Sequence, residues 1–157
     1  MSQQIPLKKI RDIANYQFGK GVGRILFPSD VTISYSKRTG RIRHVYLGEK
    51  LLVTLRPDGF FSLSTTAAKR IMEGIEPKKL WVKVHEEAEP FVAEGKSVFA
   101  RHVLNADEEI RPQEEVIVVN RNDTVVAVGR AVLSGKEMKT FSRGVAVRVR
   151  KGVAEES

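Results

Sequence analysis

Clustered arginine and lysine side chains are the residues of this sequence best suited to bind a ligand. Four cations surround the Thr39-Gly40 turn, namely Lys37, Arg38, Arg41 and Arg43. A second group near the other end of the sequence consists of Arg143, Arg148, Arg150 and Lys151. Guanidinium and ammonium groups held close together attract phosphates, so both groups are candidate anion-binding surfaces. Two interpretations without a ligand stay open: a solvated hairpin tip for the first group, and edge-strand charge that prevents sheet pairing for the second.

No spacing in the sequence predicts a catalytic or metal centre. His44, His85 and His102 are far apart and lack the spacing that puts two metal ligands on one helical turn. No serine or threonine has the His and Asp pattern of a nucleophile, and the absence of cysteine excludes disulfides and thiolate chemistry. The glycine-rich segment 19–23 does not follow a strand and lacks the Gly-Lys-Ser/Thr end of a phosphate loop. We therefore expect no catalytic residue, no metal ion and no cofactor.

The net charge of +8 is concentrated in the first half of the sequence. Residues 1–77 hold 13 Lys/Arg and 6 Asp/Glu, a balance of +7, whereas residues 78–157 hold 14 and 13, a balance of +1. A basic half favours a polyanionic partner, although a merely basic soluble protein would have the same composition.

The composition is typical of a folded chain, with 41% hydrophobic and 29% charged residues among 157. No apolar run approaches the roughly 18 residues that cross a bilayer. The first nine residues lack the apolar stretch of a signal peptide. We expect a cytoplasmic protein without a membrane partner, which the absence of cysteine also fits.

Hydrophobic periodicity predicts a small α+β module in residues 1–77. A helix is expected over residues 6–18, because Leu7, Ile10 and Phe18 follow a spacing of three to four. Turn residues then separate four short strands, expected over residues 31–36, 41–47, 51–56 and 60–64. A second helix over residues 65–75 is expected to begin at Ser64 or Thr65.

Residues 78–152 are predicted to form a small β-barrel with one helix, and residues 153–157 a frayed tail. Strands are expected over residues 80–84, 98–104, 115–120, 124–133 and 144–150, with a helix over residues 86–94 that ends at Gly95. In the last strand, alternation places Ala146, Arg148 and Arg150 outward, with the two arginines about 7 Å apart. Trp81 and the phenylalanines are assigned to the core.

Four motifs in fixed order make the second half resemble the PUA domain. They are Gly95-Lys-Ser-Val-Phe-Ala100, Ala127-Val-Gly-Arg-Ala131, Ser134-Gly-Lys-Glu-Met138 and Arg143-Gly-Val-Ala-Val-Arg148. The PUA domain at the C-terminal end of archaeosine tRNA-guanine transglycosylase is particularly similar. The first half resembles the small α+β module before that domain, through Ala14-Asn-Tyr-Gln-Phe-Gly19, Leu26-Phe27 and Thr39-Gly-Arg-Ile-Arg43. Gln113 stands where the family has a glycine. This departure affects the expected tightness of that turn and not the expected fold.

The resemblance implies an α+β fold, a small N-terminal α+β module followed by a mostly β PUA pseudo-barrel. It also implies a surface that grips helical RNA, in tRNA the acceptor stem and its 3′ end, through phosphates and 2′-hydroxyls. The positions that match this surface are Gly95, Lys96, Ser97, Arg101, Arg143, Arg148, Arg150 and Lys151. Arg101 and His102 are expected on opposite faces of one strand, and Arg101 is assigned to RNA. An ordinary helix end with a solvated lysine is the alternative for Gly95 and Lys96.

The hairpin cations Arg38, Arg41 and Arg43 would extend this RNA footprint or meet an acidic partner subunit. The catalytic barrel and cysteine-rich zinc site of the transglycosylase have no counterpart in the sequence. The resemblance therefore implies a non-catalytic protein that binds tRNA or other structured RNA, acting alone or with a catalytic transglycosylase subunit. A ribosome-assembly or translation adaptor is the main alternative, and a self-contained RNA-modifying enzyme is a third hypothesis.

Overall fold

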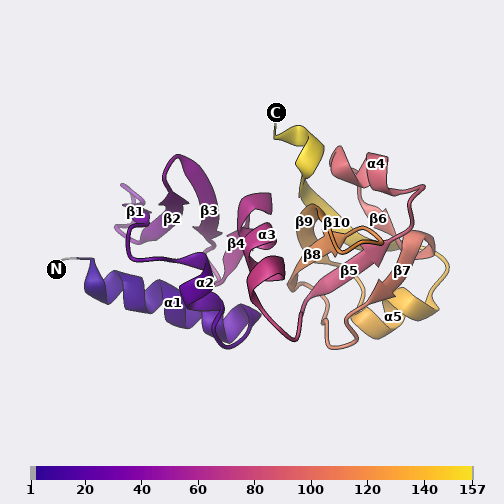
Figure 1. The fold of residues 1–157 in the computed structure, drawn as a ribbon, viewed down its shortest axis with the longest axis horizontal. Coiled ribbons are helices and arrows are strands. Elements are labelled where there is room, and N and C mark those ends of the chain that lie inside the picture. Colours follow the sequence, from indigo (N-terminus) through magenta and orange to yellow (C-terminus); the bar gives the residue numbers. More distant parts are fainter. Residues whose placement is uncertain (1–2, 157) are drawn as a thin grey trace. The chain divides into compact units, whose positions relative to one another are not determined.

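The computed structural model describes residues 3–156, which divide into two compact units (Figure 1). The first unit ends at Pro77 and the second begins at Lys78. Each unit has its own sheet and its own set of buried apolar side chains.

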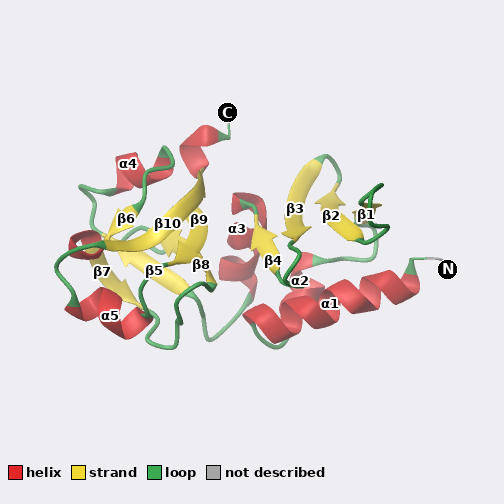
Figure 2. Ribbon diagram, turned by 180° about the vertical axis from the view of Figure 1, so that it is seen from behind, coloured by secondary structure: helices red, strands yellow, loops and turns green. Residues whose placement is uncertain are grey.

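The first unit is a four-stranded sheet with helices. It contains α1 (Gln4–Phe18), α2 (Val22–Leu26), β1 (Thr32–Tyr35), β2 (Ile42–Leu47), β3 (Lys50–Leu55), β4 (Phe61–Leu63) and α3 (Thr65–Gly74). The strands form an antiparallel meander, in which each strand pairs with the next one in the chain. α1 and α2 lie on the same side of the sheet (Figures 1 and 2). The α+β class predicted for residues 1–77 is confirmed.

α1 buries the stripe that its periodicity predicts. Ile10, Ala14 and Phe18 are buried at intervals of four residues. At the corner before α2, the Gly23 backbone N–H donates a hydrogen bond of 2.7 Å to the Asn15 side chain. A Cβ atom on Gly23 would lie 2.4 Å from the Arg11 carbonyl oxygen, so the two helices approach this closely only with a glycine here. The glycine-rich segment 19–23 is therefore a helix corner and not a phosphate loop.

The β1–β2 hairpin places the basic segment 37–43 at one end of the sheet. The Ser36 backbone N–H donates to the Arg41 carbonyl and the Gly40 N–H to the Ser36 carbonyl, both at 2.8 Å. Gly40 has a φ of 73°, a left-handed conformation that favours glycine in such a turn. A tight turn of this kind leaves the arginine side chains around it in solvent.

The second unit is a strongly curved six-stranded sheet. It contains β5 (Trp81–Val84), α4 (Glu89–Ala93), β6 (Val98–Phe99), the 3₁₀ turn η1 (Ala100–His102), β7 (Val103–Ala106), β8 (Glu115–Val119), β9 (Val125–Ala131), α5 (Gly135–Thr140), β10 (Val145–Gly152) and the 3₁₀ turn η2 (Val153–Glu155). The strand order is β6-β10-β9-β8-β5-β7, so β6 and β7 are opposite edges. The chain from Phe99 to Val103 spans at most roughly 14 Å. The sheet must therefore curve until its edges approach each other, which confirms the predicted mostly β pseudo-barrel.

Several local predictions for this unit are wrong. The strand expected over residues 98–104 is broken by η1, because the chain turns there from one sheet edge to the other. The helix expected over residues 86–94 begins only at Glu89, where Pro90 fits the first helical turn. The helix α5 was not expected, although Ser134 and Glu137 form a capping box at its start.

The chain end also differs from the frayed tail predicted for residues 153–157. Val153–Glu155 form η2, which packs against α4. The Gly152 backbone N–H donates a hydrogen bond of 2.8 Å to the Glu155 side chain. This bond fixes the turn after the last strand, while Ser157 lies outside the described residues.

Candidate nucleic-acid interface

The loop after α4 carries Gly95, Lys96 and Ser97, the first of the predicted RNA contacts. Gly95 has a φ of 102°, and its N–H donates to the Val92 carbonyl at 2.9 Å, as in a helix C-terminal turn. Lys96 is exposed and Ser97 is half-buried. A Cβ atom on Gly95 would lie 2.7 Å from a carboxylate oxygen of Glu155. The loop thus offers an ammonium group and a hydroxyl, while Glu155 occupies the space beside Gly95.

Arg101 and His102 lie in η1. The prediction that they lie on opposite faces of one strand is therefore wrong. Arg101 is exposed, and its guanidinium carbon lies 5.4 Å from the centroid of the Phe99 ring. The half-buried His102 meets the same ring edge-on, with centroids 6.2 Å apart. One exposed aromatic ring therefore positions both residues, with the arginine in cation–π contact.

The start of the last strand brings Arg143 beside this turn. Phe99 pairs with Val145, and the Ala100 backbone N–H donates to the Gly144 carbonyl at 2.9 Å. Arg143, immediately before Gly144, is exposed. Two segments far apart in the sequence thus form one surface, which we name the Phe99 surface and define by Lys96, Phe99, Arg101 and Arg143.

β10 does not follow the strict alternation that was predicted. Ala146, expected outward, is buried next to Val147, whereas Arg148 is exposed. The pairing register shifts between Val145 and Val147 and again between Val149 and Lys151. The second shift is a β-bulge at Arg150, yet Arg148 and Arg150 are both exposed, as alternation predicted.

Arg150 is bound to a buried carboxylate of β8. The side chain of Glu115 is completely buried, and it accepts hydrogen bonds from Nη1 of Arg150 at 2.9 Å and from Nη2. A buried carboxylate is costly unless it is paired. Both arginines predicted to form one outward row are exposed. They differ in that Arg150 is paired with Glu115. Lys151, the next residue, is half-buried.

Three phenylalanines that were predicted to be core residues are exposed. Phe91, Phe99 and Phe141 are 61%, 41% and 45% exposed. The Phe91 carbonyl accepts a hydrogen bond of 3.0 Å from the Lys96 N–H, and Phe141 directly follows α5, two residues before Arg143. Apolar residues in short segments resemble core residues, so their proximity to cations was the one signal that could have found them. Exposed rings beside cations are suited to stacking on unpaired bases.

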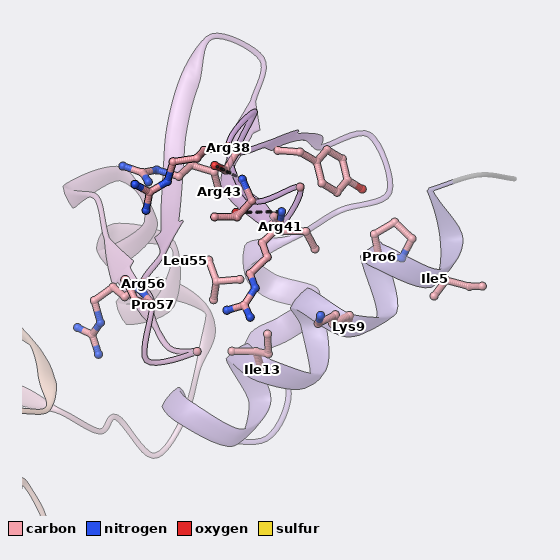
Figure 3. A pocket seen from close by; sticks show the side chains of 16 residues that line it. Ile5, Pro6, Lys9, Ile13, Arg38, Arg41, Arg43, Leu55, Arg56 and Pro57 are labelled. Carbon is pink, nitrogen blue, oxygen red and sulfur yellow. Dashed lines mark hydrogen bonds between the residues drawn. The ribbon is translucent and has the colours of Figure 1, made fainter.

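The predicted arginines of the first unit line an open hollow of about 1020 Å³ (Figure 3). Arg38, Arg41 and Arg43 are exposed. Arg41 extends from the hairpin toward Lys9 and Ile13 of α1 (Figure 3). The structure thus brings the hairpin cations together with Lys9, a cation of the first helix.

One titratable group beside these arginines is perturbed. Burial, and after it the charge of Arg43, lowers the pKa of His44 below its ordinary value. Its Nδ1 lies 3.1 Å from the Thr54 hydroxyl oxygen. Among residues 3–156, no group of three or more His, Asp and Glu side chains is placed to hold a metal ion. No helix in the same part of the chain is long and apolar enough to cross a membrane.

Two family models match the chain in succession. The patch-forming domain C2 of tRNA-guanine transglycosylase matches residues 8–78, and the PUA domain matches residues 80–153. Similar curated proteins include the tRNA-guanine(15) transglycosylases of Methanothermobacter thermautotrophicus and Thermoplasma volcanium, 44% and 46% identical over 147 residues. Both matches cover 93% of this chain but only 22% and 23% of the relatives. The chain thus spans less than a quarter of the length of these transglycosylases.

Solved structures with the same fold extend over both units. A hypothetical protein of Pyrococcus horikoshii matches with a TM-score of 0.76 and 24% identity, over 96% of this chain and 91% of that one. A conserved PUA domain protein of Thermoplasma acidophilum matches with a TM-score of 0.72 and 20% identity, over 99% and 93%. At these identities the likeness establishes the fold alone.

The part of the transglycosylases that this chain matches is their C-terminal portion, without the catalytic barrel. Both halves of the resemblance predicted from sequence motifs are confirmed by these matches. The chain is therefore a PUA-domain protein in which a domain C2 of the tRNA-guanine transglycosylase type precedes the PUA domain.

Proposed function

We propose that this chain binds tRNA through its PUA domain, at the acceptor stem and 3′ end, as a non-catalytic component of a transglycosylase-type tRNA modification system. Two successive domain matches and relatives named for tRNA-guanine transglycosylation support the proposal. Because the matched portion lacks the catalytic barrel, this chain's role is to hold the RNA.

The observation that carries the proposal is the state of the cations on the Phe99 surface. Lys96, Arg101 and Arg143 are exposed, and none has a carboxylate partner within residues 3–156. Other exposed cations of the same domain are paired, for example Arg121 with Glu86 at 3.7 Å. Cations that have no carboxylate partner and that lie beside an exposed ring are available to bind phosphates.

The geometry fits the two parts of a tRNA end. Helical RNA is contacted mainly at phosphates and 2′-hydroxyls, which Lys96, Arg143 and Arg148 suit as solvent-facing donors. Unpaired 3′ nucleotides stack on aromatic rings and guanidinium planes, which Phe99 and Arg101 supply together. Phe91 and Phe141 are two further exposed rings of the same domain.

A catalytic transglycosylase barrel is the proposed partner, on the same chain or on a separate subunit. The relatives contain such a catalytic part in addition to the portion matched here. The proposed division of labour gives tRNA docking to the domains described here and base exchange to the barrel.

The test is binding to intact tRNA, to tRNA lacking its 3′ end, and to an unrelated hairpin of equal length, over a range of salt concentrations. We expect tighter binding to intact tRNA, and a loss of about tenfold when Arg101 and Arg143 are both replaced by alanine. Arg121→Ala, which removes a paired cation of the same domain, is the matched control and is expected to change affinity little. Equal and steeply salt-dependent binding of all three RNAs would contradict tRNA recognition and leave only charge attraction.

A further inference from the structure

The hollow of the first unit, which we name the basic hollow, has walls from three elements. Its lining comes from α1 (residues 5–13), from the β1–β2 hairpin (residues 35–43) and from the end of β3 with the turn that follows it (residues 55–59). A volume of about 1020 Å³ accommodates several side chains of a ligand. Figure 3 shows Arg41 extending across it from the hairpin toward α1.

The charge of the basic hollow is not neutralised by its own unit. Among residues 3–156, five cations line it and no acidic side chain does. Arg56 is paired with Asp58 at 3.2 Å. Lys9, Arg38, Arg41 and Arg43 have no ion pair or side-chain hydrogen bond within residues 3–156. Like charges gathered in this way repel one another, and a bound anionic group relieves that repulsion.

Apolar side chains occupy the same surface. Ile5 is 83% exposed and Tyr35 is 50% exposed, while Ile13 and Leu55 are half-buried in the wall. Contiguous exposed apolar groups on a soluble domain mark contact sites. A surface of arginines, a tyrosine and aliphatic residues has the composition of a protein-binding surface, in which arginine and tyrosine supply most of the binding energy.

A nucleic acid fits this surface less well than a polypeptide does. Duplex RNA is bound by cations that reach phosphates across an open surface, whereas the basic hollow is concave and has an aliphatic wall. A single strand needs several rings on which its bases stack, and Tyr35 is the one aromatic residue among the lining residues.

We propose that the basic hollow is the docking site for an acidic segment of another protein that also carries aliphatic side chains. Its carboxylates pair with Arg41, Arg43 and Lys9, with guanidinium groups suited to bidentate contacts. Its aliphatic side chains pack on Ile13 and Leu55. The inference does not depend on tRNA binding, because the lining residues belong to the first unit and the Phe99 surface to the second.

The experiment is a selection from a displayed library of random peptides of about 12 residues on the full chain, with the Arg41→Glu/Arg43→Glu variant used for counter-selection. We expect enriched peptides to combine Asp or Glu with Leu, Ile or Val. A synthetic copy of the best peptide should lose about tenfold or more in affinity for the double variant. Ile5→Ser should cost severalfold, and its side chain is so exposed that folding is unaffected.

Arg24→Glu is the matched control, because Arg24 is an exposed cation of the same unit outside the lining. Circular dichroism melting establishes that each variant is folded. Enrichment of peptides without carboxylates, or an equal loss of affinity with Arg24→Glu, would overturn the proposal. The proposal would also be overturned if no peptide is enriched while oligouridine or a short RNA duplex binds the full chain and does not bind the double variant. The basic hollow would then be an RNA-binding site.

Discussion

The two units hold 13 and 14 Lys/Arg residues, but these cations meet different surroundings. In the second unit, several cations are paired with carboxylates; the pairs include Lys83–Asp123, Lys139–Glu108 and Arg150–Glu115. In the first unit, the hairpin arginines and Lys9 have no such partner among the described residues. The same residue types therefore form ion pairs at some positions and remain available to a ligand at others.

The comparison shows why net charge is a poor guide to a binding surface. The second unit is almost neutral, yet among the described residues no carboxylate is paired with Lys96, Arg101, Arg143 or Arg148. A binding surface is defined by cations that the fold leaves unpaired. The following predictions test this distinction by removing paired and unpaired cations in turn.

The largest effect is expected for Arg150→Ala. This change removes the guanidinium that is paired with the buried carboxylate of Glu115, so the free energy of unfolding should fall by about 3 kcal/mol. Arg148→Ala, two residues earlier, should stay within about 0.5 kcal/mol of the unmodified chain. Urea denaturation of the full chain measures both values, and equal losses would show that the ion pair has no special role.

The second prediction concerns RNA affinity. Arg148→Ala should weaken tRNA binding by about 1 kcal/mol and reduce the slope of log affinity against log salt concentration by about one. Lys139→Ala should leave that slope unchanged, because Lys139 is paired with Glu108 at 2.7 Å. Fluorescence titrations at several salt concentrations provide the slopes. A similar change in both variants would remove the distinction between paired and unpaired cations.

The third prediction compares the sign of two stability changes. Arg41→Ala should raise the free energy of unfolding by up to about 0.5 kcal/mol, because it relieves repulsion within the basic hollow. Lys83→Met should lower it by about 0.5 kcal/mol, because Lys83 is paired with Asp123 at 3.0 Å. Both changes should shrink at high salt. Denaturation curves at low and high salt measure both changes in the free energy of unfolding. A destabilised Arg41→Ala protein would mean that the arginine supports the fold.

The smallest effect is a pH dependence at His44. Its pKa is lowered in the folded protein by burial and by Arg43, so the unfolded chain binds this proton more readily. The contribution of His44 to the free energy of unfolding is fully present above the pKa of about 6.5 that the histidine has in the unfolded chain. It declines as the pH falls below that value, until folded His44 is protonated as well. Thermal melting should show a drop of no more than about 2 °C over this range, which His44→Gln abolishes and Arg43→Ala reduces.

Local sequence patterns predicted the elements whose structure depends on neighbours in the chain. The α1 stripe of Ile10, Ala14 and Phe18 follows from helical periodicity, and the Ser64 cap follows from its hydroxyl, which accepts a hydrogen bond of 3.1 Å from the Ala67 N–H. The capping box of Ser134 and Glu137 was equally local, so α5 was predictable and was missed.

The features that were not predictable arise between distant segments. The break at Ala100–His102 follows from curvature of the whole sheet, and the bulge at Arg150 from its pairing with β9. The exposure of Phe99 depends on its position on β6, at the edge of the sheet. None of these has a local pattern, because alternation describes a regular strand and cannot locate its interruptions.

The sequence by itself determined the domain order, the α+β class and the placement of cations near both ends of the PUA domain and in the first hairpin. These follow from periodicity, turn residues and motifs, which act over a few residues. Only the tertiary structure decided that Arg150 is bound to a buried carboxylate, that Lys9 joins the hairpin arginines, and that Phe99 supports Arg101. The physical reason is that the pairing of a charge depends on which distant group the sheet brings within hydrogen-bonding distance.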